Sequence, residues 1–312
     1  MASRLKSDIP LKYEAAVAGG IPVIKGLREG AAANEIGRVY GILNGTCNYI
    51  LTTMEKEGRD FGAVLKEAQD LGYAEADPSF DVDGIDAAHK LSILASLAFG
   101  TQIDFDAVDI SGIRDVSAAD ISEAAALGYR IRLVGVAENR TDGLFQRVHA
   151  VLVPIHHPLA NVDGSLNAVL AEGNFVGSLF FSGRGAGEGP TASAVVADLI
   201  DIARDEYGDP FAMQVAQLAK PPKAGSGDNI GRVYMRFMVQ DRPGVLAEIA
   251  AAMRDAGVSI ESVIQRGANA DGSVLLVVVT HDSAERAIDA TLQRLSGSDS
   301  LVAQPVVMPI LG

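Results

Sequence analysis

The sequence GYAEADPSFDVDGIDAAHK occupies residues 72–90 and carries five acidic side chains and one lysine. From Ile85 to Phe99, apolar residues recur at helical spacing. Asp83 stands where the N-cap of that helix would lie. Asp86 and Lys90 are four residues apart, so they project from one face of the helix. The stretch therefore predicts an acidic loop leading into a helix that presents an acid and a base.

This pattern has two interpretations. An acidic loop beside an acid and a base is suited to binding a small cationic metabolite. A solvated loop with an ordinary surface pair of Asp86 and Lys90 has the same spacing, because such pairs are common on exposed helices. Spacing alone leaves both interpretations open.

Composition limits the class of protein. The 312 residues suffice for two domains, and 48% hydrophobic residues with 21% charged residues indicate a filled core rather than disorder. The formal charge of −14 disfavours nucleic acid or an anionic membrane as a partner. The single cysteine, Cys47, excludes an internal disulfide and fits a reducing cytoplasm. We expect no secretion signal and no membrane span.

Three histidines, His149, His156 and His157, lie on an expected strand and in the turn after it. Their spacing matches no standard set of zinc ligands, and no cysteine is close in sequence. We therefore expect no zinc site there.

The first two thirds of the chain predict an α/β (α+β) unit with a mixed sheet. A short strand is expected near residues 11–13, and Pro22 fits the first turn of a helix that continues to Gly30. Further strands are expected over residues 39–43, 131–137, 145–153, 167–171 and 178–182, and helices over 48–56, 61–71, 118–127 and 192–204.

The last third predicts a separate unit. Residues 220–229 are rich in proline, glycine and serine, as expected of a linker. After them we expect the order βαββαβ, which is the ferredoxin-like pattern. Its strands are expected over residues 233–240, 259–265, 273–280 and 302–309, and its helices over 245–256 and 283–295.

Several motifs together resemble the homoserine dehydrogenase family, and they follow the family's order from about residue 11 to residue 310. They are YEAAVAGGIP at 13–22, GILNGTCNYI at 41–50, GYAEADP at 72–78, DGIDAAHK at 83–90, GRGAG at 183–187 and PTAS at 190–193. The last unit, with DRPGVL at 241–246, resembles an ACT domain.

The resemblance implies an enzyme that interconverts L-homoserine and L-aspartate 4-semialdehyde with NAD or NADP, in threonine and methionine biosynthesis. It also implies a catalytic and dimerisation domain over residues 1–219, a linker over 220–229 and an ACT domain over 230–312. Family members open with a dinucleotide-binding Rossmann domain, whereas no glycine-rich turn follows a first strand near residue 1. We therefore expect a fragment without its main cofactor domain, inactive alone. The alternative is a non-catalytic amino-acid-binding regulatory or assembly protein.

The resemblance assigns roles around the opening stretch. Lys90 would transfer the proton at the substrate oxygen, and Asp86 would hold the substrate near it. Glu75 would pair with the substrate ammonium, in an acidic pocket that Asp81 shares and Tyr73 lines. Gly45 and Thr46, at a helix start, would meet the substrate carboxylate. The alternative for these two residues is a glycine-containing turn with Thr46 as a helix cap.

Two glycine-containing segments receive further roles. Gly72, Gly185 and Gly187 are candidate cofactor contacts, and residues 183–205 would return to the cofactor domain. The apolar face of the helix over 192–204 would then be exposed, docked elsewhere or covered by another subunit. The carboxylate of Glu14 with the backbone of Val17, Gly19 and Ile21 resembles a sodium site. The alternative is an ordinary strand-to-helix turn.

In the ACT-like unit, the turn 241–246 is the candidate effector site, with L-threonine as the expected ligand. Its residues are Asp241, Arg242, Pro243, Gly244, Val245 and Leu246. The alternative is an oligomerisation module without a ligand. In either case we expect a homodimer or a homotetramer.

Overall fold

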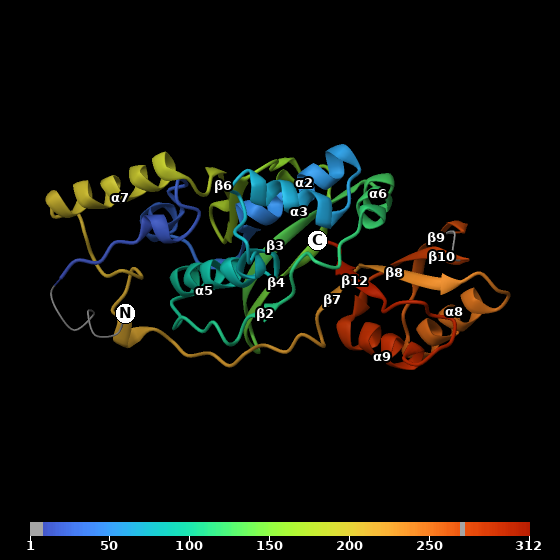
Figure 1. Ribbon diagram of the computed structural model, residues 1–312. Coiled ribbons are helices and arrows are strands. Elements are labelled where there is room, and N and C mark those ends of the chain that lie inside the picture. Colours follow the sequence, from blue (N-terminus) through green and yellow to red (C-terminus); the bar gives the residue numbers. More distant parts are fainter. Residues whose placement is uncertain (1–8, 269–271) are drawn as a thin grey trace. The chain divides into compact units, whose positions relative to one another are not determined.

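The computed structural model describes residues 9–268 and 272–312, and the chain divides into two compact units (Figure 1). Unit 1 comprises Met1–Ala118, Arg132–His149 and His157–Ala224; unit 2 comprises Ala119–Ile131, Ala150–His156 and Gly225–Gly312. Each unit is described by itself below.

The larger sheet of the described residues has six strands in the order β2-β4-β3-β1-β5-β6. β1 pairs with both β3 and β5 in antiparallel fashion, whereas β2 pairs with β4 in parallel. The sheet is therefore mixed, as the sequence predicted. The strands are β1 (Ile36–Ile42), β2 (Asp109–Ile110), β3 (Tyr129–Arg140), β4 (Gly143–Pro154), β5 (Leu166–Gly173) and β6 (Gly177–Arg184).

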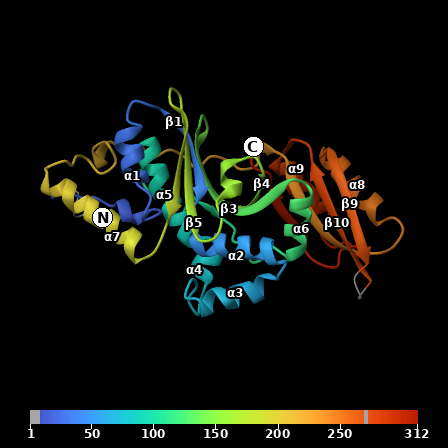
Figure 2. The same ribbon diagram turned by 90° about the horizontal axis from the view of Figure 1, so that it is seen from above.

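Helices pack on this sheet through apolar faces. α5 (Ile85–Phe99) packs against β1, and α2 (Gly45–Glu57) packs against β5. The fit is close at Gly135 of β3, where an added Cβ would lie 3.1 Å from Leu43 and 3.4 Å from Leu91. Figure 2 shows α2 grouped with α3 (Phe61–Asp70) and α4 (Ser79–Val82). The remaining α-helices in the described part of unit 1 are α1 (Val23–Lys25), which continues as a wider turn over Gly26–Gly30, and α7 (Glu188–Ala203).

The predicted strand at residues 11–13 is wrong. Tyr13 instead precedes a short 3-10 helix, Glu14–Ala16. The carboxylate of Glu14 accepts hydrogen bonds from the backbone N–H groups of Ile24 and Lys25, at 2.8 and 2.9 Å. The segment turns to satisfy the start of α1 and has no strand partner among the described residues.

The predicted N-cap of α5 is also wrong. Gly84, with φ of +86°, occupies that position, and Asp83 ends α4. The Asp83 carboxylate pairs with the guanidinium of Arg114. The left-handed conformation of Gly84 separates α4 from α5, and glycine adopts that conformation without steric cost.

Unit 2 contains an antiparallel four-stranded sheet in the order β12-β8-β10-β9. Its strands are β8 (Val233–Gln240), β9 (Ile260–Ala268), β10 (Ser273–Thr280) and β12 (Val306–Pro309), and its helices are α8 (Val245–Ala256) and α9 (Glu285–Leu295). Phe237, Met253 and Ile288 meet in its core. The predicted ferredoxin-like βαββαβ unit is confirmed. A short two-stranded sheet of β7 (Ile230–Gly231) and β11 (Ser283–Ala284) accompanies it.

A helix from earlier in the sequence belongs to the same unit. α6 (Ala118–Ala126) places the fully buried carboxylate of Asp120 against β8. Asp120 accepts from the hydroxyl of Tyr234 at 3.0 Å and from the guanidinium of Arg236 at 2.8 Å. Glu123 accepts from Arg266 of β9 at 2.9 Å. The sheet of unit 2 is therefore tied by charged hydrogen bonds to residues 119–131.

Candidate functional site

Lys90 and Asp86 form an ion pair on α5, one helical turn apart. Lys90 Nζ lies 2.7 Å from Asp86 Oδ2 and 3.2 Å from the carbonyl oxygen of Leu43. The two side chains are about one fifth exposed, at 22% and 19%. The pair predicted from the spacing is therefore present, and it is reachable from solvent although most of its surface is covered.

Asn44 joins this pair to the acidic loop. Its amide nitrogen donates to Asp81 Oδ1 at 2.7 Å and to Asp86 Oδ2 at 2.8 Å. Its amide oxygen accepts from the backbone N–H of Cys47, which caps the start of α2. One buried side chain thus positions two carboxylates and a helix start together. Sequence reasoning gave Asn44 no role of its own; its N-cap position ahead of Gly45 was the available signal.

The start of α2 faces the same group of side chains. The backbone N–H groups of Gly45 and Thr46 have no hydrogen-bond acceptor within the described residues, whereas the Thr46 hydroxyl donates to the carbonyl of Tyr73 at 2.8 Å. Free N–H groups at a helix start, together with the helix dipole, favour an anion. The Thr46 side chain does not cap the helix, because Asn44 does.

Cys47 lies beneath the acidic loop and is fully buried. Its thiol donates to the carbonyl of Asp81 at 3.2 Å. Burial raises the pKa of this thiol well above its ordinary value, and the carboxylates of Asp81 and Asp86 raise it further. Cys47 therefore stays protonated and supports the loop as a packed side chain.

Asn167 brings the glycine-rich loop next to the start of α2. Its amide nitrogen donates to the carbonyl of Ile42 at 3.0 Å. A Cβ added to Gly185 would lie 1.8 Å from Asn167 Oδ1, and one added to Gly45 would lie 3.6 Å from the same atom. The chain at Gly185 can pass Asn167 only without a side chain. Gly187, with φ of +113°, then occupies the N-cap position of α7.

The Glu14 loop adjoins this glycine-rich loop. The backbone N–H of Gly20 donates to the carbonyl of Arg184 at 3.1 Å, and an added Cβ at Gly19 would lie 3.3 Å from the carbonyl oxygen of Gly185. Burial raises the pKa of Glu14, although its two N–H donors act in the opposite direction. Both oxygens of Glu14 already accept N–H groups, and the carbonyl of Ile21 accepts from Val23. The sodium site at Glu14, Val17, Gly19 and Ile21 stays a prediction.

Within residues 9–268 and 272–312, no group of three or more His, Cys, Asp or Glu side chains is arranged to hold a metal ion. His149 lies on β4, where burial and, to a smaller extent, the charge of Arg147 lower the pKa of its imidazole to about 3. His157 Nδ1 accepts from the backbone N–H of Leu159 at 3.2 Å.

The loop residues Gly72, Tyr73 and Glu75 lie at the surface. Tyr73 is 47% exposed, and its ring lies 4.8 Å from that of Tyr49. Gly72 follows the end of α3 with φ of +77°, a conformation that glycine adopts without steric cost. The Glu75 carboxylate has no hydrogen bond or ion pair in the part of the chain that the structure describes. The structure therefore brings Asp81, Asp86 and Lys90 together and leaves Glu75 free to meet a ligand.

Charged side chains help to attach α7 to the rest of its unit. Asp198 accepts from the backbone N–H of Glu14 at 2.9 Å. Asp201 pairs with Lys12 and with Lys25, which lower its pKa to about 2. The face with apolar residues points to solvent: Val195, Val196, Leu199 and Ile200 are 44–59% exposed. Of the three alternatives for this helix, the chain by itself shows exposure of the apolar face.

In unit 2, the turn 241–246 leads into α8. Gly244, with φ of +99°, occupies the N-cap position. The guanidinium of Arg242 donates to the hydroxyl of Ser300 at 3.0 Å, and Glu248 accepts from the hydroxyls of Ser298 and Ser300. These two hydroxyls lower the pKa of Glu248. Asp241, Pro243, Val245 and Leu246 complete the turn, whose role as an effector site stays a prediction.

This chain is similar to known proteins in both sequence and structure. Residues 22–200 match the family model described as homoserine dehydrogenase, and residues 233–297 match the ACT domain. A homoserine dehydrogenase from Pseudomonas aeruginosa is 47% identical over 314 residues, which cover 98% of this chain and 72% of that protein.

Two solved structures are similar as well. The crystal structure of a homoserine dehydrogenase from Thiobacillus denitrificans superposes with a TM-score of 0.88 at 43% identity, covering 96% of this chain and 70% of that one. A hyperthermophilic archaeal homoserine dehydrogenase in complex with NADPH superposes with a TM-score of 0.54 at 30% identity, covering 62% of this chain and 55% of that one.

Proposed function

This chain belongs to the homoserine dehydrogenase family, a family of oxidoreductases, and we propose that its acidic loop, α2 and α5 form the site that binds L-homoserine. The observation that carries the proposal is the network in which Asn44 joins Asp81 and Asp86, and Asp86 joins Lys90. The reaction is the interconversion of L-homoserine and L-aspartate 4-semialdehyde. We place it in threonine and methionine biosynthesis, in the cytoplasm.

The substrate's charged groups fit the arrangement of this site. The free N–H groups of Gly45 and Thr46 take its carboxylate. Glu75, whose carboxylate has no partner in the described residues, pairs with its ammonium, and Asp81 adds negative charge to the same pocket. Tyr73 closes the exposed side of the loop. Opposite charges at the two ends of the site orient the substrate, which is how binding energy positions a reacting group.

Lys90 acts at the reacting end. Its Nζ is held by Asp86 and by the carbonyl of Leu43, two anchors that leave one hydrogen-bonding direction of the amine for the substrate oxygen. There it moves the proton of the hydroxyl group. Asp86 keeps Lys90 in place and contacts the substrate beside it. NAD or NADP, when bound, supplies the hydride chemistry.

The cofactor needs a further binding surface. A related archaeal enzyme was solved with NADPH. The larger sheet of the described residues has a single parallel pair, β2 with β4, and so lacks the parallel strands and crossover helices of a dinucleotide-binding fold. We infer that a separate domain binds most of the cofactor, and that Gly72, Gly185 and Gly187 contact it from this chain. Residues 183–205 would face that domain.

We further propose the domain division 1–219, 220–229 and 230–312, with the last part regulatory. An amino-acid effector, L-threonine first, would bind at the turn 241–246, where the start of α8 can take its carboxylate. Phe175 lies in the turn before the edge strand β6, and Phe180 lies on that strand. Both are exposed, which supports assembly as a homodimer or homotetramer. Among the described residues, no helix has the length and apolar content of a bilayer span.

The catalytic proposal is tested in a fusion of this chain to the dinucleotide-binding domain of a family member, with nicotinamide absorbance as the readout. Lys90→Ala and Asp86→Asn should lower kcat by about two to four orders of magnitude. Glu75→Gln should raise KM for L-homoserine more than it lowers kcat. The matched control is Lys66→Ala with Asp70→Asn, an exposed pair at the same spacing on α3. A Lys90→Ala enzyme with near-normal kcat would refute the role of Lys90.

The cofactor part of the proposal has its own test. The 312-residue chain without the fused domain should bind L-homoserine in calorimetry yet show no turnover with NAD or NADP. Turnover at the rate of the fusion would contradict the inferred separate cofactor domain and leave the homoserine site standing.

A further inference from the structure

A short segment of unit 1, residues 219–224, crosses from the end of α5 to the start of β4; we call it the strap. At one end, Ala219 N donates to the carbonyl of Gly100 at 2.9 Å, and the carbonyl of Ala219 accepts from Gln102. At the other end, Leu144 N donates to the carbonyl of Pro222, and Ala224 N donates back to Leu144. Both ends of the strap are therefore fixed.

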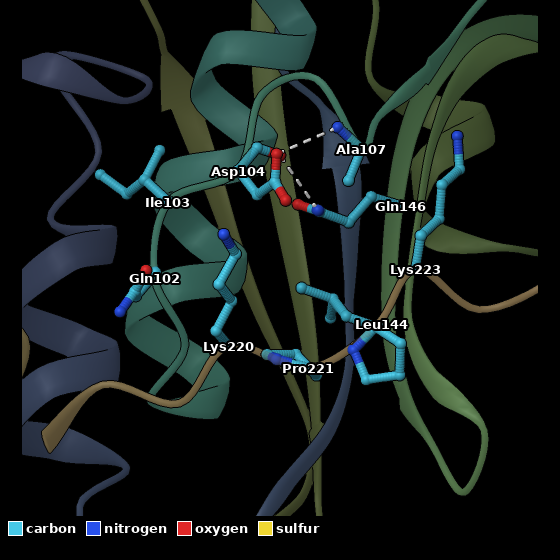
Figure 3. Close-up of a pocket in the computed structure, with 10 residues that line it drawn as sticks. Gln102, Ile103, Asp104, Ala107, Leu144, Gln146, Lys220, Pro221 and Lys223 are labelled. Carbon is cyan, nitrogen blue, oxygen red and sulfur yellow. Dashed lines mark hydrogen bonds between the residues drawn. The ribbon is translucent and has the colours of Figure 1, made fainter.

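Between these ends, the backbone of Lys220 and Pro221 makes no hydrogen bond among the described residues. Pro221 and Pro222 have no backbone N–H and cannot continue a ladder of hydrogen bonds. The strap lines a pocket of about 160 Å³ (Figure 3). A protein cavity of about 150 Å³ accepts benzene, so this pocket has room for a small metabolite. Ile103, Leu144 and Pro221 give it apolar walls.

The floor of the pocket contains an unsatisfied acceptor. Gln146, on β4, is only 1% exposed, and its amide nitrogen donates to the carbonyl of Asp104 at 3.3 Å. That bond fixes the orientation of the amide. Gln146 Oε1 has no hydrogen-bond donor in the part of the chain that the structure describes, and it is almost wholly covered, so a ligand reaches it only when the strap moves. A buried carbonyl without a donor lowers stability, and a ligand with an N–H group would remove that cost.

The rim of the pocket contains a free cation. Lys220 is exposed and has no hydrogen bond or ion pair among the described residues. Figure 3 shows its ammonium extending from the strap toward the side of the pocket where Ile103 and Asp104 lie. Lys223 differs, because its Nζ lies 2.6 Å from Asp109 Oδ1. Of the two strap lysines, Lys220 alone is available for an anion.

We propose that this pocket binds a small α-amino acid, with its carboxylate on Lys220, its ammonium donating to Gln146 Oε1 and its side chain against Ile103 and Leu144. A simple anion would leave Gln146 Oε1 unpaired, and a simple cation would leave Lys220 unpaired. A zwitterion satisfies both groups. The flexible aliphatic part of the Lys220 side chain can move aside when the amino acid enters the pocket. This site is separate from the proposed homoserine site and from the turn 241–246, and its occupant would fasten the strap at its middle.

The test follows the side-chain amide of Gln146 by NMR in the full 312-residue chain labelled with ¹⁵N-glutamine. The signal is assigned as the one missing from Gln146→Met, a volume-conserving variant. L-Alanine and L-threonine should each shift it saturably, whereas acetate and methylammonium, which carry one charge each, should not. Lys220→Ala should weaken binding about tenfold or more, because it removes a charged hydrogen bond.

Three control variants separate this site from other events. Lys66→Ala removes an exposed lysine of α3, Lys90→Ala alters the proposed homoserine site, and Arg242→Ala alters the turn of unit 2; none should change the affinity measured at Gln146. The side chain of Lys220 is exposed, so the Lys220→Ala variant should fold even if the Gln146→Met variant does not. The proposal is overturned if no amino acid shifts the signal at millimolar concentration, if Lys220→Ala binds normally, or if acetate alone shifts the signal equally.

Discussion

The amide nitrogen of Asn44 lies 2.8 Å from Asp86 Oδ2, the same oxygen to which Lys90 donates. Asp86 thereby receives two donors on one atom, from residues 42 positions before it and four after it. The position of the acid on α5 depends on a residue at the start of α2. This dependence makes Asn44 a positioning residue for the proposed site.

Asn44→Asp should disrupt the site while hardly changing its shape. The variant replaces two donors with a third carboxylate beside Asp81 and Asp86, and Asn44 is buried. Repulsion between like charges that are poorly solvated should reduce the free energy of unfolding by about 3 kcal/mol. Urea denaturation measures this loss. Adding Asp86→Asn should restore part of it, and an additive double mutant would contradict the coupling.

Gly185→Ala should destabilise the junction of the glycine-rich loop with the start of α2. The added methyl group would overlap Oδ1 of Asn167, whose amide nitrogen donates to the carbonyl of Ile42. Overpacking of this kind costs about 1–3 kcal/mol. The control is Gly189→Ala in the first turn of α7, where an added Cβ meets nothing within 4 Å and alanine is the better helix former. Thermal unfolding should separate the two variants; equal melting temperatures would contradict the prediction.

Acidification should destabilise the fold through His149. The pKa of the folded imidazole is about 3, against an ordinary value of 6.5. Between these values the unfolded chain binds a proton that the folded chain does not, so stability falls as the pH drops from 6.5 toward 3. The slope is at most about 1.4 kcal/mol per pH unit for one proton.

His149→Gln should flatten that dependence in urea titrations taken at several pH values. The exposed His156 is the matched control, and His156→Gln should retain the full slope. An unchanged slope in His149→Gln would show that other groups cause the acid dependence.

Asp120→Ala should destabilise unit 2. It leaves the hydroxyl of Tyr234 and the guanidinium of Arg236 without their shared carboxylate, and both side chains are largely buried. Removing one partner of a buried pair costs about 3–5 kcal/mol. Asp255→Ala, which removes an exposed partner of Arg254, is the control and should change stability little. Guanidinium denaturation gives the comparison, and a neutral Asp120→Ala would contradict a structural role for α6 in this unit.

Local patterns were enough for most elements. The predicted bounds 233–240, 245–256 and 273–280 agree with β8, α8 and β10, because dense apolar strands and a glycine-bounded amphipathic helix leave few alternatives. The pair of Asp86 and Lys90 was predictable for the same reason, since one helical turn fixes their separation.

The errors and omissions involve contacts between distant parts of the chain. The segment at Glu14 forms a 3-10 helix rather than a strand, because the Glu14 carboxylate accepts a hydrogen bond from the start of α1 ten residues later. Asp83 forms an ion pair with Arg114, and Gly84 occupies the N-cap position of α5. Asn44 and Asn167 contact groups 37 to 125 residues away. No periodicity within one element reports such contacts.

One face of α7 contributes to a buried ion pair, and the other face exposes apolar side chains to solvent. Lys12 and Asp201 are nearly inaccessible to solvent, so dissolved ions screen their attraction weakly. Sulfate and similar salts strengthen the burial of apolar surface. In concentrated ammonium sulfate, the exposed apolar face of α7 should therefore bind other apolar surfaces more strongly, while the ion pair keeps the helix packed on its unit. A hydrophobic-interaction column should then retain the chain through Leu199 and its neighbours.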